Sequence, residues 1–280
     1  MPVTATLRRL VVGAAVAVTA LSAASACSAE PDEPQQLDDW HVIALPDGMA
    51  ASTLLPTRES LLVGGSRPVG DGRAPALAGL PLDGTDVGPS VIPLTPATPY
   101  GKVADLVSLT GDEDSLTALG AAHGGAHANF RWTIWSGTAD GVTDQPQTFE
   151  TFGGWEAGTL LGLAGDSRGP LVVGTWQGAH GADGAIWRAA GDRWVRQRAE
   201  PTWTSTTTRQ VGPRTVEQGV DGGVLVSGSV IDLSDGVHQG AAYWRDVDGS
   251  WTLTRLTDPG DRSEAWSTTC GGVCWSVGRR

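Results

Sequence analysis

Five short strand-like segments, each ending in glycine, recur along the chain at a nearly constant spacing. The glycines are Gly64, Gly120, Gly174, Gly228 and Gly278. Self-similarity at a fixed period is typical of solenoids and propellers, in which each repeat packs on its neighbours. The spacing therefore predicts a repeating unit of about 54 residues, slightly longer than the common propeller repeats.

Each of the first four repeats also contains strand-like runs on both sides of its glycine segment. The predicted first strands are residues 52–55, 104–109, 159–163, 215–220 and 264–269. The predicted third strands are residues 76–82, 131–135, 185–188 and 241–245, and the predicted fourth strands are residues 91–94, 148–152, 194–199 and 251–256. Turn dipeptides such as Asp140-Gly141 and Asp248-Gly249 separate third from fourth strands, as hairpins require. Four antiparallel strands per repeat make one blade of a β-propeller.

The two ends of the repeat region predict how such a ring closes. Residues 40–46 resemble the fourth-strand segments that begin at Trp194 and Trp251, although they precede any first strand. The fifth repeat has sequence for its first two strands alone. We therefore expect an all-β domain over residues 40–280, a five-bladed propeller in which the N-terminal strand completes the last blade and removes its open edge. A piece of a larger propeller is the alternative.

Residues 1–26 have the parts of a secretory signal peptide, with Arg8-Arg9 followed by an apolar stretch. Small residues then precede Cys27, a pattern that resembles the bacterial lipobox, in which the cysteine carries the lipid of a mature lipoprotein. The resemblance implies export and anchoring by Cys27 to the outer face of the cytoplasmic membrane. A plain signal peptide that leaves Cys27 as a free thiol is the alternative.

Residues 27–39 are rich in Glu, Asp, Pro and Gln and have little to bury, which predicts a flexible acidic tether between lipid and domain. The whole chain resembles the secreted lipoproteins of actinobacteria. Its net charge of −12 argues against nucleic-acid binding, which needs clustered cations.

The cysteine count predicts one disulfide. With Cys27 lipidated, Cys270 and Cys274 remain and can bridge across a tight turn in an oxidising compartment. A structural zinc site would need further ligands nearby, so we expect neither a metal nor a cofactor.

Residues 187–194 and 244–251 each begin and end with tryptophan and enclose a turn, Gly191-Asp192 and Asp248-Gly249 respectively. These units resemble degenerate Asp-box (BNR) repeats of sialidase-type propellers, although an Asp-Gly turn is also ordinary hairpin chemistry. Sialidase activity is not implied, because the chain has no Arg-Ile-Pro motif and its two tyrosines are Tyr100 and Tyr243.

In a propeller of this topology the second-to-third and fourth-to-first connections open on one face. Large aromatic and histidine side chains in these connections are candidate ligand contacts: Tyr100, His123, His127, Trp155, Trp176, His180, Trp203 and His238. We expect a non-catalytic ligand-binding or scaffold propeller, with a cell-wall glycan or a protein as its partner. The alternative is a glycan-acting hydrolase, which would need two convergent carboxylates.

Overall fold

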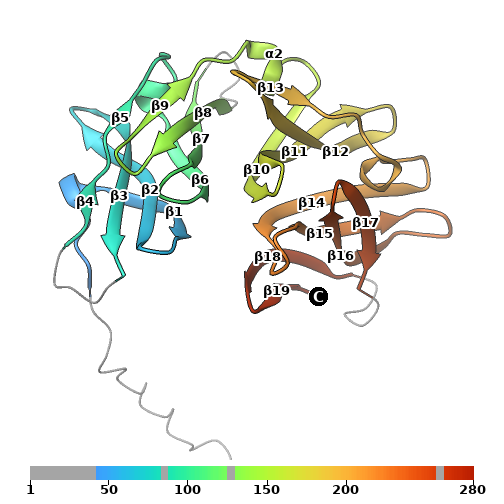
Figure 1. Cartoon of the computed structure of the whole chain (residues 1–280). Helices are drawn as coiled ribbons and strands as arrows, with labels where there is room; N and C mark the ends of the chain where they lie inside the picture. The colour runs from blue at the N-terminus through green and yellow to red at the C-terminus, as the bar shows by residue number, and fades with distance from the viewer. Residues whose placement is uncertain (1–41, 83–87, 125–129, 257–261) are drawn as a thin grey trace, which may run out of the picture. The chain divides into compact units, whose positions relative to one another are not determined.

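The computed structural model describes residues 42–82, 88–124, 130–256 and 262–280, which form a nearly all-β, propeller-like protein (Figure 1). In each repeat, successive strands pair antiparallel with one another. The first strands are β1 (Ala50–Pro56), β6 (Asp105–Gly111), β10 (Ala157–Asp166), β14 (Arg209–Gln218) and β18 (Glu264–Gly271). The second strands are β2 (Ser60–Val69), β7 (Leu116–His123), β11 (Gly169–Gly178), β15 (Val224–Asp232) and β19 (Val273–Arg279).

Four of the repeats continue with a third and a fourth strand. The third strands are β3 (Gly72–Pro81), β8 (Phe130–Thr138), β12 (Gly181–Ala190) and β16 (His238–Val247). The fourth strands are β4 (Ser90–Val91), β9 (Gly141–Gln145), β13 (Arg193–Arg196) and β17 (Ser250–Arg255). These strands overlap the segments that the sequence predicts, with one exception in the second repeat.

The exception is the fourth strand of the second repeat, for which the prediction at residues 148–152 is wrong. The helical turn α2 (Phe149–Phe152) occupies this segment, and β9 is the fourth strand. β9 follows β8 through a tight turn, in which Thr138 pairs with Gly141. Phe149 and Phe152 are three positions apart, a spacing that suits one side of a helix better than one face of a strand.

A short strand that follows the first repeat pairs with the sheet of the second repeat. β4 pairs with β3 in its own sheet, whereas β5 (Leu94–Thr95) pairs in parallel with β9. The sheet of the second repeat therefore has five strands, in the order β5-β9-β8-β7-β6.

The predicted turn at Asp248-Gly249 is confirmed and is a tight hairpin. Val247 pairs with Ser250, and the two turn residues have φ of 52° and 90°. Positive φ at both central residues defines the type I′ turn, whose twist matches that of the strands it joins. The side chain of Asp246 accepts a hydrogen bond from the Gly249 N–H at 2.9 Å, which fixes the turn further.

A β-bulge in the first strand explains the recurring glycine of the third, fourth and fifth repeats, and explains Gly65 in the first repeat. The pairing register shifts in every first strand, and each has a bulged residue at the equivalent position: Ser52, Val107, Leu161, Arg214 and Trp266. β10 has a second shift, between Ala157 and Leu160. In four repeats, a Cβ on the facing glycine would lie 1.9 to 2.6 Å from the carbonyl oxygen two positions before the bulge; these glycines are Gly65, Gly174, Gly228 and Gly278. A side chain there would force the two backbones apart. In the first repeat the glycine in this position is Gly65, not Gly64.

Tryptophans of the third strands fill the interior of the sheets. Trp135, Trp187 and Trp244 are fully buried. An aromatic residue from the preceding connection packs on the last two: Phe152 lies 5.9 Å from Trp187, and Trp203 lies 5.2 Å from Trp244, between ring centroids. Each connection thus closes the core of the sheet that follows it.

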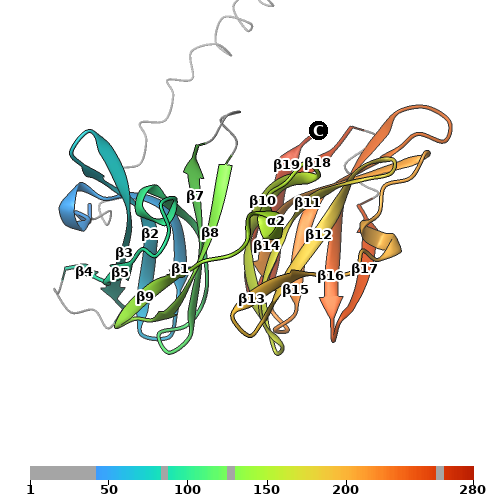
Figure 2. The same ribbon diagram turned by 90° about the horizontal axis from the view of Figure 1, so that it is seen from above.

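The first strands also join neighbouring sheets. β1 contacts β6, β6 contacts β10, β10 contacts β14 and β14 contacts β18. One such contact is a hydrogen bond from the Leu163 N–H to Ser108 Oγ at 2.9 Å. Successive sheets therefore pack through their first strands, as in a propeller, and Figure 2 shows β10 and β14 next to each other.

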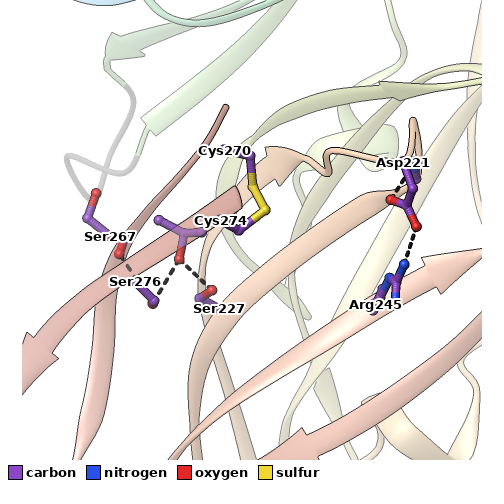
Figure 3. Close-up of a disulfide and its surroundings, with 9 residues drawn as sticks. Asp221, Ser227, Arg245, Ser267, Cys270, Cys274 and Ser276 are labelled. Atoms are coloured by element: carbon purple, nitrogen blue, oxygen red, sulfur yellow. Dashed lines mark hydrogen bonds and ion pairs between the residues drawn. A yellow bond between two sulfur atoms is a disulfide. The ribbon is translucent and has the colours of Figure 1, made fainter. Parts of the chain in front are cut away.

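The last sheet consists of β18 and β19 joined by a short turn. The predicted disulfide between Cys270 and Cys274 is confirmed and bridges this turn, with Cα atoms 4.0 Å apart (Figure 3). Below it, Thr268 Oγ1 donates to Ser227 Oγ at 2.5 Å, which ties β18 to β15.

The structure does not show the closing strand or the number of blades. Residues 40 and 41 lie outside the described part of the chain, and residues 42–45 form no strand before the short 3₁₀ helix η1 (Pro46–Gly48). The signal segment, Cys27 and the tether also lie outside it. Within the described ranges, no helix has the length and apolar character needed to cross a bilayer.

Candidate functional site

The candidate ligand residues do not gather in one place. His127 lies outside the described residues. The others are distributed over the connections and strand ends as follows: Tyr100 before the 3₁₀ helix η2 (Gly101–Val103), His123 at the end of β7, Trp155 before β10, Trp176 in β11, His180 between β11 and β12, Trp203 in the 3₁₀ helix η3 (Pro201–Trp203), and His238 at the start of β16.

Trp203 is a core residue and does not belong to an exposed rim. Its side chain is 1 % exposed, stacks on Trp244 and meets Trp251 edge-on at 4.8 Å. Gly184 of β12 makes room for it, because a Cβ there would lie 2.1 Å from the indole. The prediction of a surface position is wrong because this connection folds inward onto the next sheet.

Three other candidates have surroundings that differ from one to the next. The Trp155 side chain is fully exposed. The His180 carbonyl accepts a hydrogen bond from Gln210 Nε2 at 2.9 Å, and His238 Nε2 lies 3.4 Å from Asp235 Oδ1. Among the residues that the structure describes, no three His, Cys, Asp or Glu side chains are grouped as a metal site would require.

Tyr100 and His123 do come together with residues that the sequence did not single out. A cavity of about 170 Å³ lies between β8, β9 and α2, and three exposed aromatic side chains line it: Tyr100, Phe130 and Phe149. His123 packs on Phe130 with ring centroids 4.3 Å apart. We call this cavity the aromatic pocket.

Arg131 supplies the positive charge of the aromatic pocket. Its guanidinium carbon lies 5.1 Å from the centroid of the Phe149 ring and 6.0 Å from that of Tyr100. Such cation–π contacts hold the guanidinium at the pocket wall. Arg131 has no carboxylate within ion-pair distance among the described residues, so its charge is available to a ligand.

Asp144 supplies a buried carboxylate to the same pocket. Its side chain is almost fully buried, and Oδ2 accepts hydrogen bonds from Thr98 N at 2.8 Å, Thr98 Oγ1 at 2.6 Å and Ala97 N at 3.3 Å. Oδ1 is also buried and has no donor among the described residues. A buried acceptor without a partner is costly, so a donor at this wall would stabilise the site.

A second, larger cavity of about 1200 Å³ lies between the third and fourth repeats, along β12 and β13 and beside η3. Trp176, a predicted ligand residue, lines it together with Glu156 and Arg196. We call it the inter-sheet groove. No residue lines both this groove and the aromatic pocket.

An ion-pair cluster lies at one end of the groove and joins the two sheets. Arg188 pairs with Asp166 at 2.6 Å and with Asp246 at 3.4 Å, and Arg168 pairs with both carboxylates. Burial opposes ionisation of Asp166, but the hydrogen bonds from Arg188 and Arg168 outweigh it and lower its pKa to about 2. The cluster is anionic and cationic in equal measure, which is typical of a structural contact.

One carboxylate has the opposite shift. Burial raises the pKa of Glu217 on β14, as a general acid of a hydrolase would need. Glu217 lines neither the groove nor the aromatic pocket, so it does not add a catalytic group to either site.

Comparison with known proteins leaves the family open. No family model and no curated protein matches the chain. Three similar solved structures are a mannose phosphorylase from Leishmania mexicana (10 % identity, 81 % of this chain and 78 % of that one, TM-score 0.39), a family 117 glycoside hydrolase from Zobellia galactanivorans (11 %, 79 % and 74 %, 0.42) and a protein of unknown function from Dyadobacter fermentans (11 %, 77 % and 71 %, 0.45). At these TM-scores the similarity supports no inference about activity.

Proposed function

We propose that this chain is an exported lipoprotein whose β-propeller binds a ligand without transforming it. The N-terminal sequence supports the first part, with an apolar signal segment, a lipobox-like Cys27 and an acidic tether. Replacing Cys27 with Ser should move the protein from the detergent phase to the aqueous phase. Normal processing and unchanged partitioning of this variant would rule out the lipid anchor.

The finer fold proposal is a ring of five blades closed by residues 40–46. Five bulged first strands and the likeness of residues 40–46 to fourth strands support it. β19 offers the edge, because it pairs with β18 alone among the described strands.

The observation that carries ligand binding is the aromatic pocket. Exposed aromatic side chains that gather around a cavity are typical of an interaction site, and here Tyr100, Phe130 and Phe149 do so. Arg131 adds a guanidinium that has no ion-pair partner among the described residues, and Asp144 adds an acceptor, Oδ1, that has no donor among them. A largely apolar wall with a few convergent polar groups is the usual composition of a ligand site.

The pocket suits a small unit with an apolar face and both donor and acceptor groups. A sugar ring of a cell-wall glycan fits this description, because its C–H face stacks on aromatic rings while its hydroxyls bond polar groups. A side chain of a peptide ligand is the other partner that we expected from the sequence.

The experiment is a fluorescence titration that uses Trp132, which lines the pocket, as the reporter. Chitotetraose and a peptidoglycan stem peptide serve as separate probes for the glycan and the peptide. A Tyr100→Ala/Phe149→Ala double variant should bind about tenfold more weakly, because each substitution deletes a ring on which the ligand stacks. Trp155→Ala is the matched control, since that side chain is exposed and outside the pocket.

Two outcomes would contradict the proposal. In the first, neither probe, nor a mixture of muropeptides, changes the fluorescence of the parent protein. In the second, the Trp155→Ala control loses as much affinity as the double variant.

A further inference from the structure

We infer that the inter-sheet groove is a second binding site, for a hydroxylated anion: a saccharide or polyol that carries carboxylate or phosphate groups. The groove holds about 1200 Å³ and shares no lining residue with the aromatic pocket. The inference therefore does not depend on the ligand proposed for that pocket.

Charge is the first observation. Five arginines line the groove against three carboxylates, in a chain whose net charge is −12. Two of these arginines, Arg168 and Arg188, are neutralised by Asp166 and Asp246. The other three have no carboxylate within ion-pair distance among the described residues: Arg196, Arg198 and Arg209. Of these, Arg209 donates through Nη2 to the carbonyl oxygens of Pro201 and Thr204, which hold it in place without cancelling its charge. Uncompensated guanidinium groups in a cleft favour an anionic ligand.

Two buried donors without acceptors are the second observation. Trp203 Nε1 and Arg209 Nε are both shielded from solvent and have no hydrogen-bond acceptor in the described structure. Both residues line the groove, and the Trp203 side chain is 1 % exposed. Buried polar groups are ordinarily paired, so two unpaired donors on residues that line the groove favour a ligand that carries acceptors.

The position of Arg196 is the third observation. Its guanidinium carbon lies 4.1 Å from the centroid of the Trp176 ring, and Trp176 Nε1 in turn donates to Glu156 Oε2 at 2.9 Å. Stacking on a fixed indole holds the planar guanidinium at the groove before any ligand arrives. A preorganised guanidinium loses less entropy when it binds a carboxylate or phosphate.

The carboxylates of the groove explain why the anion should also carry hydroxyls. Asp183 Oδ1 is occupied by the Ser205 N–H at 2.7 Å, whereas Glu156 and Glu200 also line the wall. A ligand that offered acceptors alone would meet repulsion from these two side chains. Hydroxyl groups can donate to them, so a sugar or polyol satisfies both signs of charge in the groove.

The test compares ligands that differ in charge and in the presence of hydroxyl groups. Trp176 lines the groove and reports binding by fluorescence. Tetragalacturonate and its methyl ester share the same sugar chain, a short glycerol-phosphate oligomer supplies phosphate, and tetraglutamate supplies carboxylates without hydroxyls. We expect tetragalacturonate or the phosphate oligomer to bind about tenfold more tightly than the methyl ester, and binding to weaken with salt.

The protein variants locate the site. Arg196→Gln/Arg198→Gln should lower the affinity for the anionic probe about fivefold to tenfold. Arg193→Gln is the matched control, because Arg193 is exposed on the same strand and does not line the groove. Both variants should melt close to the temperature of the parent protein, since the exchanged side chains form no ion pair in the described structure and only the cation–π contact of Arg196 with Trp176 is lost.

Each remaining outcome overturns part of the inference. Equal binding of tetragalacturonate and its methyl ester, without salt dependence, would show that the groove does not select an anion. Equal binding of tetraglutamate and tetragalacturonate would show that the ligand needs no hydroxyl groups. Equal loss in the Arg193→Gln control, or no binding of either anionic probe, removes the site, while the chitotetraose result at the aromatic pocket is unaffected.

Discussion

The middle sheets and the last sheet share one repeat pattern but are stabilised differently. In the sheets β10–β13 and β14–β17, Phe152 and Trp203 close the cores from the preceding connections, and the buried ion pairs of Asp166 and Asp246 join the two sheets. In the sheet β18–β19, every residue of β19 is exposed, and a disulfide bridges the turn. Packing therefore stabilises the four-stranded sheets in the middle, whereas a covalent bond holds together the two strands of the last sheet.

Removing Trp203 should have the largest effect. We expect Trp203→Ala to lower the free energy of unfolding by about 3–5 kcal/mol, because a fully buried indole leaves a cavity between Trp244 and Trp251. Trp275→Ala in the last sheet is the control, with an expected change within about 0.5 kcal/mol because that indole is exposed. Urea denaturation measures both. Equal losses would show that the two sheets are packed alike.

The repeat glycine should come next. A Cβ in Gly228→Ala would lie 2.1 Å from the Gly212 carbonyl oxygen, so the strands must separate at a cost of up to about 3 kcal/mol. Gly271→Ala in the last sheet has no atom within 4 Å of the added Cβ, and we expect it to be neutral or slightly stabilising. Thermal unfolding compares the pair. A neutral Gly228→Ala would mean that the bulge adapts easily.

Reducing the disulfide should cost about 2 kcal/mol, since closing so short a loop removes little entropy from the unfolded chain. Mass spectrometry of the unreduced protein should find the peptide containing Cys270 and Cys274 two hydrogens lighter than the free dithiol. Reduction should make the backbone amides of β18 and β19 exchange faster with solvent, while the exchange rates in the middle sheets stay the same. Free thiols at both positions would remove the covalent half of the comparison.

The smallest expected effect is that of acid on the ion pairs of Asp166 between the middle sheets. The pKa of Asp166 is lowered to about 2, so the stability it contributes is complete above its unfolded pKa of about 4 and is lost as the pH falls toward 2. After allowance for solvent screening we expect about 1 kcal/mol from this residue. Asp166→Asn should therefore show a shallower loss of stability between pH 4 and pH 2. Parallel curves for parent and variant would place the acid sensitivity elsewhere.

The sequence predicted the strands because their signals are local. Short apolar runs, a recurring glycine and Asp-Gly turns each act within one hairpin, and the strands follow them closely. The sequence does not show why the glycine is needed. The cause is a backbone carbonyl of the preceding strand, and only the pairing register brings that carbonyl opposite the glycine. The failure at residues 148–152 has the same origin: whether Phe152 belongs to a strand or a helical turn is decided by its contact with Trp187 of the next sheet.

The candidate site was predicted less well. Tyr100 lines the aromatic pocket, and His123 packs on Phe130 beside it. Phe149, Arg131 and Asp144 also line the pocket, but they come from segments whose sequence resembles ordinary strand. Their meeting depends on how β9 and α2 lie against β8. Trp203 shows the converse error, since a loop tryptophan is exposed or buried according to a distant partner, here Trp244 on the third strand of the next sheet.

The parallel pairing of β5 with β9 has a consequence for how repeats of this kind can be exchanged. A repeat whose strands all pair within itself can be duplicated, deleted or transplanted as a module. Here, excision of the first repeat at its apparent boundary would take Leu94 and its neighbour Thr95 from the second sheet and leave β9 with an unpaired edge. The first two repeats should therefore unfold as one cooperative unit. If the chain is cut after Thr95, the second repeat needs another strand in place of β5 to remain stable.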